Sequence, residues 1–345
     1  MAIIQKAILF VCFIIFTSCV SDDPKNTNQT LVNTSGQGVI ITNEGNFMFG
    51  NASITYYSPK DSTVTKDIYQ ISNKNTLGDV CQSLSFFNHL LYVVVNNSGK
   101  VEILNPHSFK SEGEITGLTS PRYFLGVNRS KAYISDLYAN KIAVVNLTSK
   151  QIVNHIPCKG WTEEMHLANG KAYITNIESE YLFVVNTLND KLEDSLWVGL
   201  GCASIQEDKD GKLWTLCAGS SSNPITKAKL HKIDLIDFGI EKTFEFAENI
   251  RPKKLKINGN HEDLYFLANG VYKMNINAST IPTSPIIAQN YSNFYSLGIN
   301  PFNNQIYVSD ALDYTQRGKI YRYNPEGVLI HTFLADIIPG NIYFK

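Results

Sequence analysis

A short pattern of hydrophobic and polar positions recurs along most of the chain. Each copy begins with an aromatic or aliphatic anchor, continues with alternating residues and ends in most copies with a polar one, which is typical of a half-buried β-strand. Successive anchors are 52, 41, 40, 41, 51 and 42 residues apart. Repeats of about 40–45 residues are the period of four-stranded propeller blades. The seven runs are Ile40–Asn43, Tyr92–Asn96, Tyr133–Asp136, Tyr173–Asn176, Trp214–Cys217, Tyr265–Ala268 and Tyr307–Asp310.

Each repeat has the same internal order of predicted strands. The anchor strand, B, is followed by a second strand, C, such as Lys141–Asn146 or Lys319–Asn324, and then by a more polar outer strand, D, such as Gln151–Ile156. Another strand, A, precedes each anchor by about twelve residues. Asn, Asp, Gly and Pro between these runs favour tight turns and antiparallel hairpins.

The two ends of the repeat region complement each other. The first repeat has no A strand, because only a polar stretch precedes Gly38. The last repeat is followed by a surplus segment, 338–344, which is similar to the A strand Ser120–Leu125. If this segment pairs into the first blade, every sheet can bury both faces against its neighbours. The sequence therefore predicts an all-β fold over residues 38–345, a seven-bladed β-propeller closed by the C-terminal strand.

The N-terminus has the pattern of an export signal. Lys6 precedes an apolar run of ten residues, Ala7–Phe16, which is too short to span a bilayer, where about 20 are needed. The following Thr17-Ser18-Cys19 resembles a bacterial lipobox, although Phe16 stands where Leu is usual. We expect residues 1–18 to be a lipoprotein signal peptide and Cys19 to carry the lipid; an ordinary cleaved signal is the alternative.

The stretch 19–37 is polar and reads as a flexible tether. It contains Ser21-Asp22-Asp23, which resembles the acidic signal that brings some Gram-negative lipoproteins to the outer surface. We therefore expect an outer-membrane lipoprotein that is exposed on the cell surface.

The charge balance and the cysteine spacing argue against nucleic-acid binding and a zinc site. Thirty Lys and Arg residues balance 31 Asp and Glu residues, so no net basic charge favours nucleic-acid binding. Beyond the targeting segment the cysteines have no zinc-ligand spacing. Cys202 and Cys217 are expected to face each other across one hairpin, which leaves open a disulfide or two buried free thiols.

Candidate ligand contacts gather on one predicted face. In a propeller the A strands begin and the B strands end on the same side of the channel, where loops on a rigid scaffold can recognise a ligand. Aromatic rings there offer apolar contact area, while amides and charges fix orientation. The predicted ligand-binding residues are Asn46, Phe47, Asn96, Arg122, Tyr123, Tyr138, Trp161, Glu163, Glu164, Asn176, Tyr295, Asp310 and Tyr314; the wider set includes Glu44, Gln82 and Arg317.

Each of these residues also has a structural alternative. Asn and Asp at the ends of B strands are the residues that cap Asx-turns. Arg122, Glu163 and Glu164 could form salt bridges or lie on a solvated rim, and the same rim would accommodate Tyr138 and Tyr314.

No linear catalytic signature is present: the chain has no GxSxG elbow, HExxH motif or Walker loop. The seven histidines do not share one position near the predicted face. We therefore expect a protein that is not an enzyme and has no cofactor or metal. A hydrolase with a metal in the channel, held by Glu44, Asn96, Asn176 or Asp310, is the least favoured alternative.

Several segments resemble one group of surface propellers. These are Ile41–Phe47, Leu77–Ser83, Val95–Lys100, Ser120–Tyr123 and Ser309–Tyr314. They are similar to YncE-like and surface-layer-type propellers, and more narrowly to the BtuG-type lipoproteins that capture cobalamin above a TonB-dependent outer-membrane transporter. The resemblance implies capture of a nutrient such as a corrinoid for such a transporter, without assigning a ligand residue. A propeller that contacts proteins or glycans and binds no small ligand is the alternative.

Overall fold

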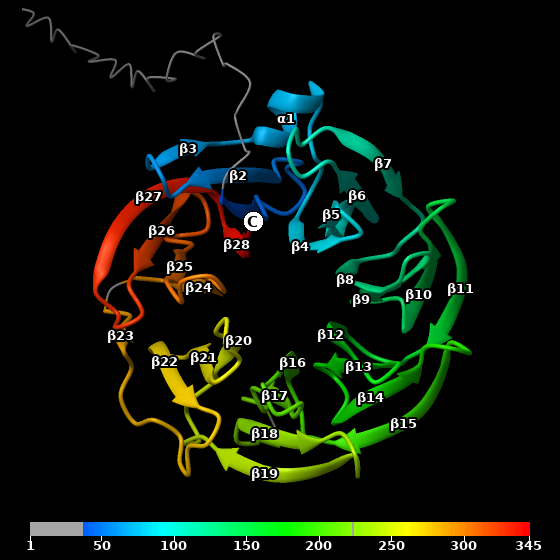
Figure 1. Cartoon of the computed structure of the whole chain (residues 1–345), viewed down its shortest axis with the longest axis vertical. Helices are drawn as coiled ribbons and strands as arrows, with labels where there is room; N and C mark the ends of the chain where they lie inside the picture. The colour runs from blue at the N-terminus through cyan, green and yellow to red at the C-terminus, as the bar shows by residue number, and fades with distance from the viewer. Residues whose placement is uncertain (1–36, 223, 291) are drawn as a thin grey trace, which may run out of the picture. The chain divides into compact units, whose positions relative to one another are not determined.

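The computed structural model describes residues 37–222, 224–290 and 292–345. They form seven four-stranded antiparallel sheets that stand as blades around a central axis (Figure 1). The predicted all-β, seven-bladed propeller is confirmed. The predicted signal peptide, Cys19 and all of the predicted tether except residue 37 lie outside the described residues. No helix within the described ranges is long and apolar enough to cross a membrane.

Each blade runs from an inner strand A to an outer strand D. Blade 1 combines β28 with β1–β3, and blades 2–7 follow in chain order. The A strands are β28 (Pro339–Phe344), β4 (Cys81–Phe87), β8 (Pro121–Asn128), β12 (Thr162–Ala168), β16 (Cys202–Glu207), β20 (Lys253–Ile257) and β24 (Phe294–Ile299). The B strands are β1 (Val39–Asn43), β5 (Leu90–Val95), β9 (Lys131–Asp136), β13 (Lys171–Asn176), β17 (Leu213–Cys217), β21 (Asp263–Leu267) and β25 (Ile306–Asp310).

The outer two layers complete each sheet. The C strands are β2 (Ser53–Ser58), β6 (Lys100–Leu104), β10 (Lys141–Asn146), β14 (Tyr181–Asn186), β18 (Lys229–Asp234), β22 (Gly270–Asn275) and β26 (Arg317–Tyr323). The D strands are β3 (Thr63–Thr65), β7 (Ser111–Ile115), β11 (Gln151–Pro157), β15 (Lys191–Trp197), β19 (Gly239–Glu245), β23 (Ile287–Ala288) and β27 (Leu329–Ile337). The predicted C strand of the last blade begins two residues earlier than expected, at Arg317. One helix, α1 (Ile68–Asn73), and the short 3-10 turn η1 (Asn96–Ser98) were not predicted.

The ring closes through its two ends, as predicted. Strand β28 lies beside β1 in an antiparallel pair, with Ile40 opposite Tyr343 and Ile41 opposite Ile342. The backbone N–H of Lys345 donates to the carbonyl of Gly38 at 2.9 Å. The C-terminal strand therefore supplies the inner edge that the N-terminal repeat lacks.

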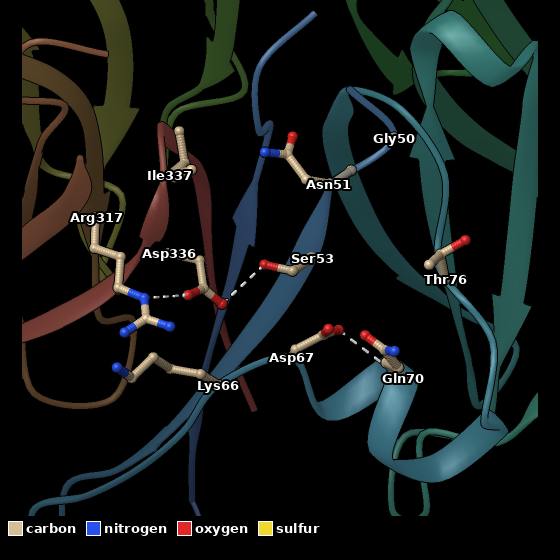
Figure 2. A pocket seen from close by; sticks show the side chains of 11 residues that line it. Gly50, Asn51, Ser53, Lys66, Asp67, Gln70, Thr76, Arg317, Asp336 and Ile337 are labelled. Carbon is tan, nitrogen blue, oxygen red and sulfur yellow. Dashed lines mark hydrogen bonds and ion pairs between the residues drawn. The ribbon is translucent and has the colours of Figure 1, made fainter. Parts of the chain in front are cut away.

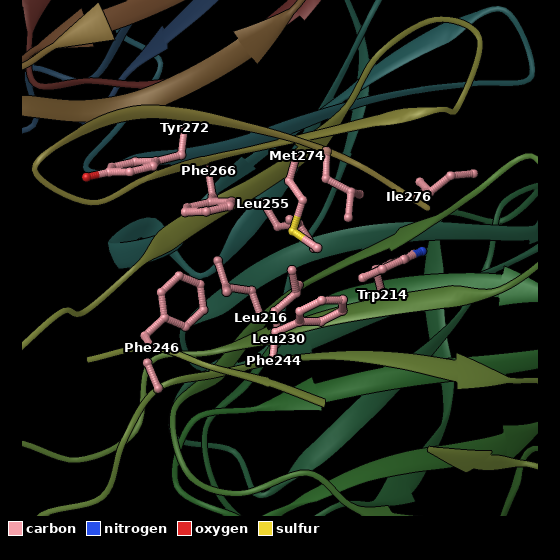
Figure 3. Packing of buried hydrophobic residues seen from close by; sticks show 12 residues of the cluster. Trp214, Leu216, Leu230, Phe244, Phe246, Leu255, Phe266, Tyr272, Met274 and Ile276 are labelled. Carbon is pink, nitrogen blue, oxygen red and sulfur yellow. The ribbon is translucent and has the colours of Figure 1, made fainter. Parts of the chain in front are cut away.

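The hydrophobic core lies between blades. Figure 3 shows the interface of blades 5 and 6, where Trp214 and Phe244 face Phe266 and Met274. Phe266 stacks on Tyr272, with ring centroids 5.4 Å apart. Alternate residues of each strand point to opposite faces, and both faces of a blade are covered by its neighbours. This geometry explains the period-two apolar pattern.

Replacement of Phe266 by Ala should lower the free energy of unfolding by about 3–5 kcal/mol, because the fully buried ring leaves a cavity between two blades. Denaturant unfolding of the purified protein measures the loss. Phe302→Ala is the matched control: this ring is 61% exposed on the β24–β25 turn, and its loss should stay within about 0.5 kcal/mol. Equal losses in the two variants would contradict a core located between blades.

Candidate functional site

Every A strand contains an irregularity at the same level of the ring. Near the start of each strand, one or two residues have no direct partner on the neighbouring B strand. Such β-bulges break the strict alternation of a strand and redirect a side chain, and they are common beside functional sites. The bulged residues are Gly340, Gln82, Arg122 with Tyr123, Glu163 with Glu164, Ala203, Lys254 with Leu255, and Tyr295. We call this level the channel mouth.

Bulged residues from three neighbouring blades form a continuous polar network. Arg122 Nε lies 2.7 Å from Glu163 Oε1, and its Nη1 donates to Oε1 of Gln82. The indole N–H of Trp161 donates to the same Glu163 oxygen. The guanidinium carbon of Arg122 lies 5.3 Å from the centroid of the Trp161 ring. Because a mostly buried charge is tolerated only when it is paired and hydrogen-bonded, these contacts lock the side chains in place.

Protonation in this network is set by burial and mutual charge. Burial opposes the charge on Arg122, but Glu163, Tyr123 and Glu44 outweigh it and raise the pKa of Arg122 above its ordinary value. Burial also raises the pKa of Tyr123 well above 10, and the carboxylates of Glu163 and Glu164 add to the effect. The mouth therefore holds a permanent cation beside a neutral phenol.

The second bulged residue of blade 4 contacts the A strands of blades 5 and 6. Glu164 Oε1 lies 3.2 Å from the ammonium of Lys256, and its Oε2 accepts the backbone N–H of Ile205 at 3.1 Å. Both oxygens of this carboxylate are thereby engaged. Glu164 therefore links three neighbouring blades at the channel mouth.

Blade 1 contributes Glu44, which follows β1 in the loop to β2. The missing side chain at Gly340 makes room for it, because a Cβ there would lie 2.6 Å from Glu44 Oε1. The hydroxyl of Tyr295 donates to the same oxygen at 2.8 Å. Burial raises the pKa of Glu44 above its ordinary value of 4.5, and Lys254 and the Tyr295 hydrogen bond oppose that rise.

Lys254 is the bulged cation of blade 6. Its backbone has a φ of 59°, which is unusual for a residue with a side chain. The ammonium makes no hydrogen bond or ion pair with any described residue, and it lies 6.0 Å from the centroid of the Tyr295 ring. Burial lowers the pKa of Lys254, and Glu44 partly counteracts this effect. A half-buried ammonium without a direct partner is available to an anionic or carbonyl group of a ligand.

The channel is hollow below the mouth. A cavity of about 280 Å³ follows the A strands toward the opposite face. It is lined by Leu84, Gln206, Lys256, Ile257, Gly298, Ile299, Pro301, Asn341, Ile342, Tyr343 and Phe344. Lys256 lines this cavity and pairs with Glu164, so the ion pair lies between the bulged residues and the cavity lining.

The structure brings seven of the predicted ligand-binding residues together at the channel mouth. Tyr314 belongs to this group through its ring, which packs edge-on against Tyr295 with centroids 6.0 Å apart. The seven are Arg122, Tyr123, Trp161, Glu163, Glu164, Tyr295 and Tyr314.

Three others lie on the surrounding loops. The side-chain amide of Asn46 donates to the carbonyl of Tyr314 at 2.7 Å and joins the loops of blades 1 and 7. Phe47 is 63% exposed beside it, and Tyr138 is 70% exposed on the β9–β10 loop. These rings surround the mouth without entering it.

The remaining three predicted residues are buried at loop bases. Asn96 donates to Ser120 Oγ at 2.9 Å, Asn176 accepts the backbone N–H of Glu178 at 3.0 Å, and Asp310 accepts that of Leu312 at 2.9 Å. For Asn176 and Asp310 this is the turn-capping geometry considered as the alternative. Their side chains shape the loops from inside.

Sequence reasoning missed the lysines of blade 6. Pro252-Lys253-Lys254 occupies the A-strand position at which blade 3 has Pro121-Arg122. Alignment of the A strands with one another could have identified this signal. The spacing obscured it, because Pro252 precedes the anchor Tyr265 by 13 residues, whereas Pro121 precedes Tyr133 by 12.

Cysteines and acidic side chains are the groups through which redox or metal chemistry could arise in this propeller. Cys202 and Cys217 are register partners between β16 and β17, and both are buried free thiols. Within residues 37–222, 224–290 and 292–345, no group of three or more His, Cys, Asp or Glu side chains could hold a metal ion.

A family profile decides the relationship of the chain. The family described as "Domain of unknown function (DUF5074)" matches residues 37–336. The chain belongs to this family. No curated protein matches the chain.

Solved structures share the fold of this DUF5074 chain at low sequence identity. One is a quinonprotein alcohol dehydrogenase-like protein of Bacteroides thetaiotaomicron, with a TM-score of 0.69 and 18% identity over 89% of this chain and 78% of the other. The periplasmic gluconolactonase of Pseudomonas aeruginosa has a TM-score of 0.69 and 10% identity over 90% and 99%. A functionally unknown protein of Desulfotomaculum acetoxidans has a TM-score of 0.67 and 12% identity over 90% and 99%.

These structures correct one expectation. The absence of linear catalytic motifs led us to expect a protein that is not an enzyme, and that inference was wrong. Propellers of the same fold include a protein described as a gluconolactonase and one described as alcohol dehydrogenase-like. In a propeller, polar residues from separate blades meet at the channel, as Arg122, Glu163 and Lys254 do here, so a linear motif is not required for chemistry.

The raised pKa of Glu44 predicts a pH-dependent stability difference. In the pH range between 4.5 and its higher folded pKa, the folded protein binds more protons than the unfolded chain, so rising pH destabilises the fold. Glu44→Gln removes this dependence, so we expect the variant to gain in melting temperature relative to the natural protein as the pH rises from 4 to 8.

Tyr295→Phe is the companion variant for this experiment. It removes a hydrogen bond that stabilises the charged carboxylate, so the loss of stability should extend to higher pH. A pH-independent difference between the natural protein and Glu44→Gln would contradict the raised pKa of the buried Glu44 carboxyl.

Proposed function

We propose that this DUF5074 propeller captures a large polar organic ligand on the face around the channel mouth, with a corrinoid as the first candidate. The observation that carries the proposal is the distribution of exposed aromatic side chains. Among the described residues, eight large aromatic side chains are exposed to solvent. Phe86 and Phe302 lie at the opposite face. Phe47, Phe49, Tyr138 and Tyr314 lie on loops of the mouth face, and Tyr181 and Trp197 lie at the same end of the outer strands β14 and β15. Exposed aromatic groups on several loops of one face favour a broad, flat ligand.

The loops that carry these rings are held from below. Asp136 Oδ1 accepts the backbone N–H groups of Tyr138 and Ala139, each at 2.9 Å. Asp79 Oδ2 accepts that of Met48 at 2.8 Å. Loops that are ordered before binding lose little conformational entropy when a ligand arrives. This rigidity supports recognition of a rigid ligand.

The charges at the mouth complement such a ligand. Arg122, Glu163 and Gln82 occupy one side of the channel, and Lys254 on another side has no direct partner. A corrinoid offers peripheral amide groups and one phosphate. The amides match the mixed donors and acceptors, and the phosphate matches the Lys254 ammonium.

We further propose that the protein is an outer-surface lipoprotein that transfers its ligand to a TonB-dependent transporter. The targeting pattern of residues 1–37 and the resemblance to BtuG-type propellers support this assignment. The exposed apolar loop tip Phe47-Met48-Phe49 supports a protein partner on the same face, because soluble proteins seldom expose such clusters without function.

Cyanocobalamin should bind to residues 20–345 and raise their melting temperature. At a concentration of 100 times the dissociation constant, the free energy of unfolding should rise by about 2.7 kcal/mol. Calorimetric titration should show that Tyr138→Ala and Lys254→Met each weaken binding about tenfold or more, which corresponds to roughly 1.4 kcal/mol.

Phe302→Ala, on the opposite face, controls for general effects of losing an exposed ring and should bind normally. The proposal fails if neither cyanocobalamin, haem nor a siderophore binds. It fails equally if both mouth variants bind as well as the natural protein.

Cys19→Ala should abolish lipid anchoring. In detergent phase partitioning of the full-length protein we expect the natural chain in the detergent phase and the variant in the aqueous phase, because the thiol is the site of acylation. Protease added to intact cells should degrade the natural protein if it faces outward. Aqueous partitioning of the natural chain would exclude the lipid anchor.

A further inference from the structure

A polar cleft lies at the seam where the ring closes, and it shares no residue with the channel mouth (Figure 2). Its volume is about 360 Å³. Three separate segments line it: the β1–β2 loop with the start of β2, the connection after β3, and the adjoining ends of β26 and β27 in blade 7. The lining residues used below are Ser53, Lys66, Asp67, Gln70, Thr76, Arg317 and Asp336.

One wall is an insertion that the propeller itself does not require. The D–A connection between β3 and β4 comprises residues 66–80, whereas residues 158–161 suffice between β11 and β12. The longer connection contains α1, whose Ile68 and Tyr69 are buried. Asn73, at its end, donates to the carbonyls of Tyr69 and Phe109, both at 2.9 Å. The insertion is therefore a fixed wall.

The facing wall is equally well anchored. Ser53 Oγ donates to Asp336 Oδ2 at 3.0 Å, and the Asp336 backbone N–H donates to Asn43 Oδ1 at 3.2 Å. Arg317 Nε lies 3.3 Å from the other Asp336 oxygen. Both Asp336 oxygens therefore have partners, and the hydrogen bonds to Ser53 and Asn43 attach the end of β27 to blade 1.

Two cations in the cleft have unused donors. The Lys66 ammonium makes no hydrogen bond or ion pair with any described residue. The terminal nitrogens of Arg317 likewise have no hydrogen-bond partner among the described residues, since its ion pair with Asp336 uses Nε. Figure 2 shows Lys66, from the insertion, extending toward the side of the cleft that holds Arg317. Unpaired donors of two cations at one place favour an anionic group, and a carboxylate can accept from both.

The rest of the insertion offers groups that can bind hydroxyls. Asp67 Oδ1 accepts the backbone N–H of Gln70 at 3.3 Å, which leaves Oδ2 free. The side chains of Gln70 and Thr76 make no hydrogen bond with described residues. Burial and the nearby Asp336 raise the pKa of Asp67, while the Gln70 N–H opposes the rise. Together, the Asp67 carboxyl, the Gln70 amide and the Thr76 hydroxyl can both donate hydrogen bonds to a polyhydroxylated ligand and accept them from it.

We propose that this cleft binds a sugar acid, with its carboxylate between Lys66 and Arg317 and its hydroxyl groups on Asp67, Gln70 and Thr76. Ligand pockets have volumes of about 300–1,000 Å³, and this cleft is near the lower limit, which fits one monosaccharide unit. A neutral sugar would leave the Lys66 ammonium and the terminal nitrogens of Arg317 without an anionic partner. The site is separate from the corrinoid proposal, and either can fail alone.

Calorimetric titration of residues 20–345 with galacturonate and glucuronate tests the proposal. We expect at least one of the two to bind, glucose to bind at least tenfold more weakly, and the affinity to fall as sodium chloride is added. Lys66→Gln and Arg317→Gln should each weaken binding about tenfold or more. Lys60→Gln, an exposed lysine on the neighbouring β2–β3 turn, is the matched control and should bind normally.

Several results would overturn the proposal. They are absence of binding by both uronates, equal binding of glucose, tighter binding of glutamate, or unchanged affinity in both cleft variants. Melting temperatures verify that each variant is folded. Tyr138→Ala should leave uronate binding intact and Lys66→Gln should leave cyanocobalamin binding intact, so the outcomes at the two sites are distinguishable.

Discussion

The pairing of β28 with β1 is the constraint on which the rest of the molecule depends. Each blade buries both faces against its neighbours, so the packing is complete only when the last blade meets the first. The same closure builds both proposed sites. Gly340 in β28 leaves the space that Glu44 occupies at the channel mouth, and Asp336, just before β28, is fastened to Asn43 and forms a wall of the cleft.

The charged residues discussed at the two proposed sites include two groups with different roles. Arg122, Glu163 and Glu164 have their charges met by other protein groups, and they link neighbouring blades into a rigid mouth. Lys254 and Lys66 have no direct counter-charge among the described residues. A buried or half-buried charge that the protein leaves unpaired is costly. A ligand that completes the pairing recovers that cost, which is the physical reason to look for ligands at these two lysines.

Much of the fold could be predicted from the sequence. Each blade packs in the same way, so its anchor residue recurs at a nearly regular spacing along the chain. The anchors Tyr133 and Tyr173 are 40 residues apart and occupy equivalent strands, and residues 338–344 were recognisable as the missing A strand. Helix α1 could not be predicted in this way, since six residues show less than two turns of helical periodicity. Lys254 was not predicted because blade 6 has one residue more than blade 3 between the A-strand proline and the anchor, which shifts the alignment. The cleft was not predicted because its walls come from segments about 250 residues apart in sequence, such as Lys66 and Arg317.

The repeated bulge in the A strands has a consequence for how such a molecule can diversify. A residue in a bulge has no partner in the ladder, so its exchange leaves the cross-strand hydrogen bonds and the contacts between blades largely intact. Seven blades place such a residue at one level, and here they range from glycine at 340 and alanine at 203 to arginine at 122 and tyrosine at 295. Propellers with this architecture can therefore exchange the chemistry of their axis one blade at a time while the scaffold stays constant.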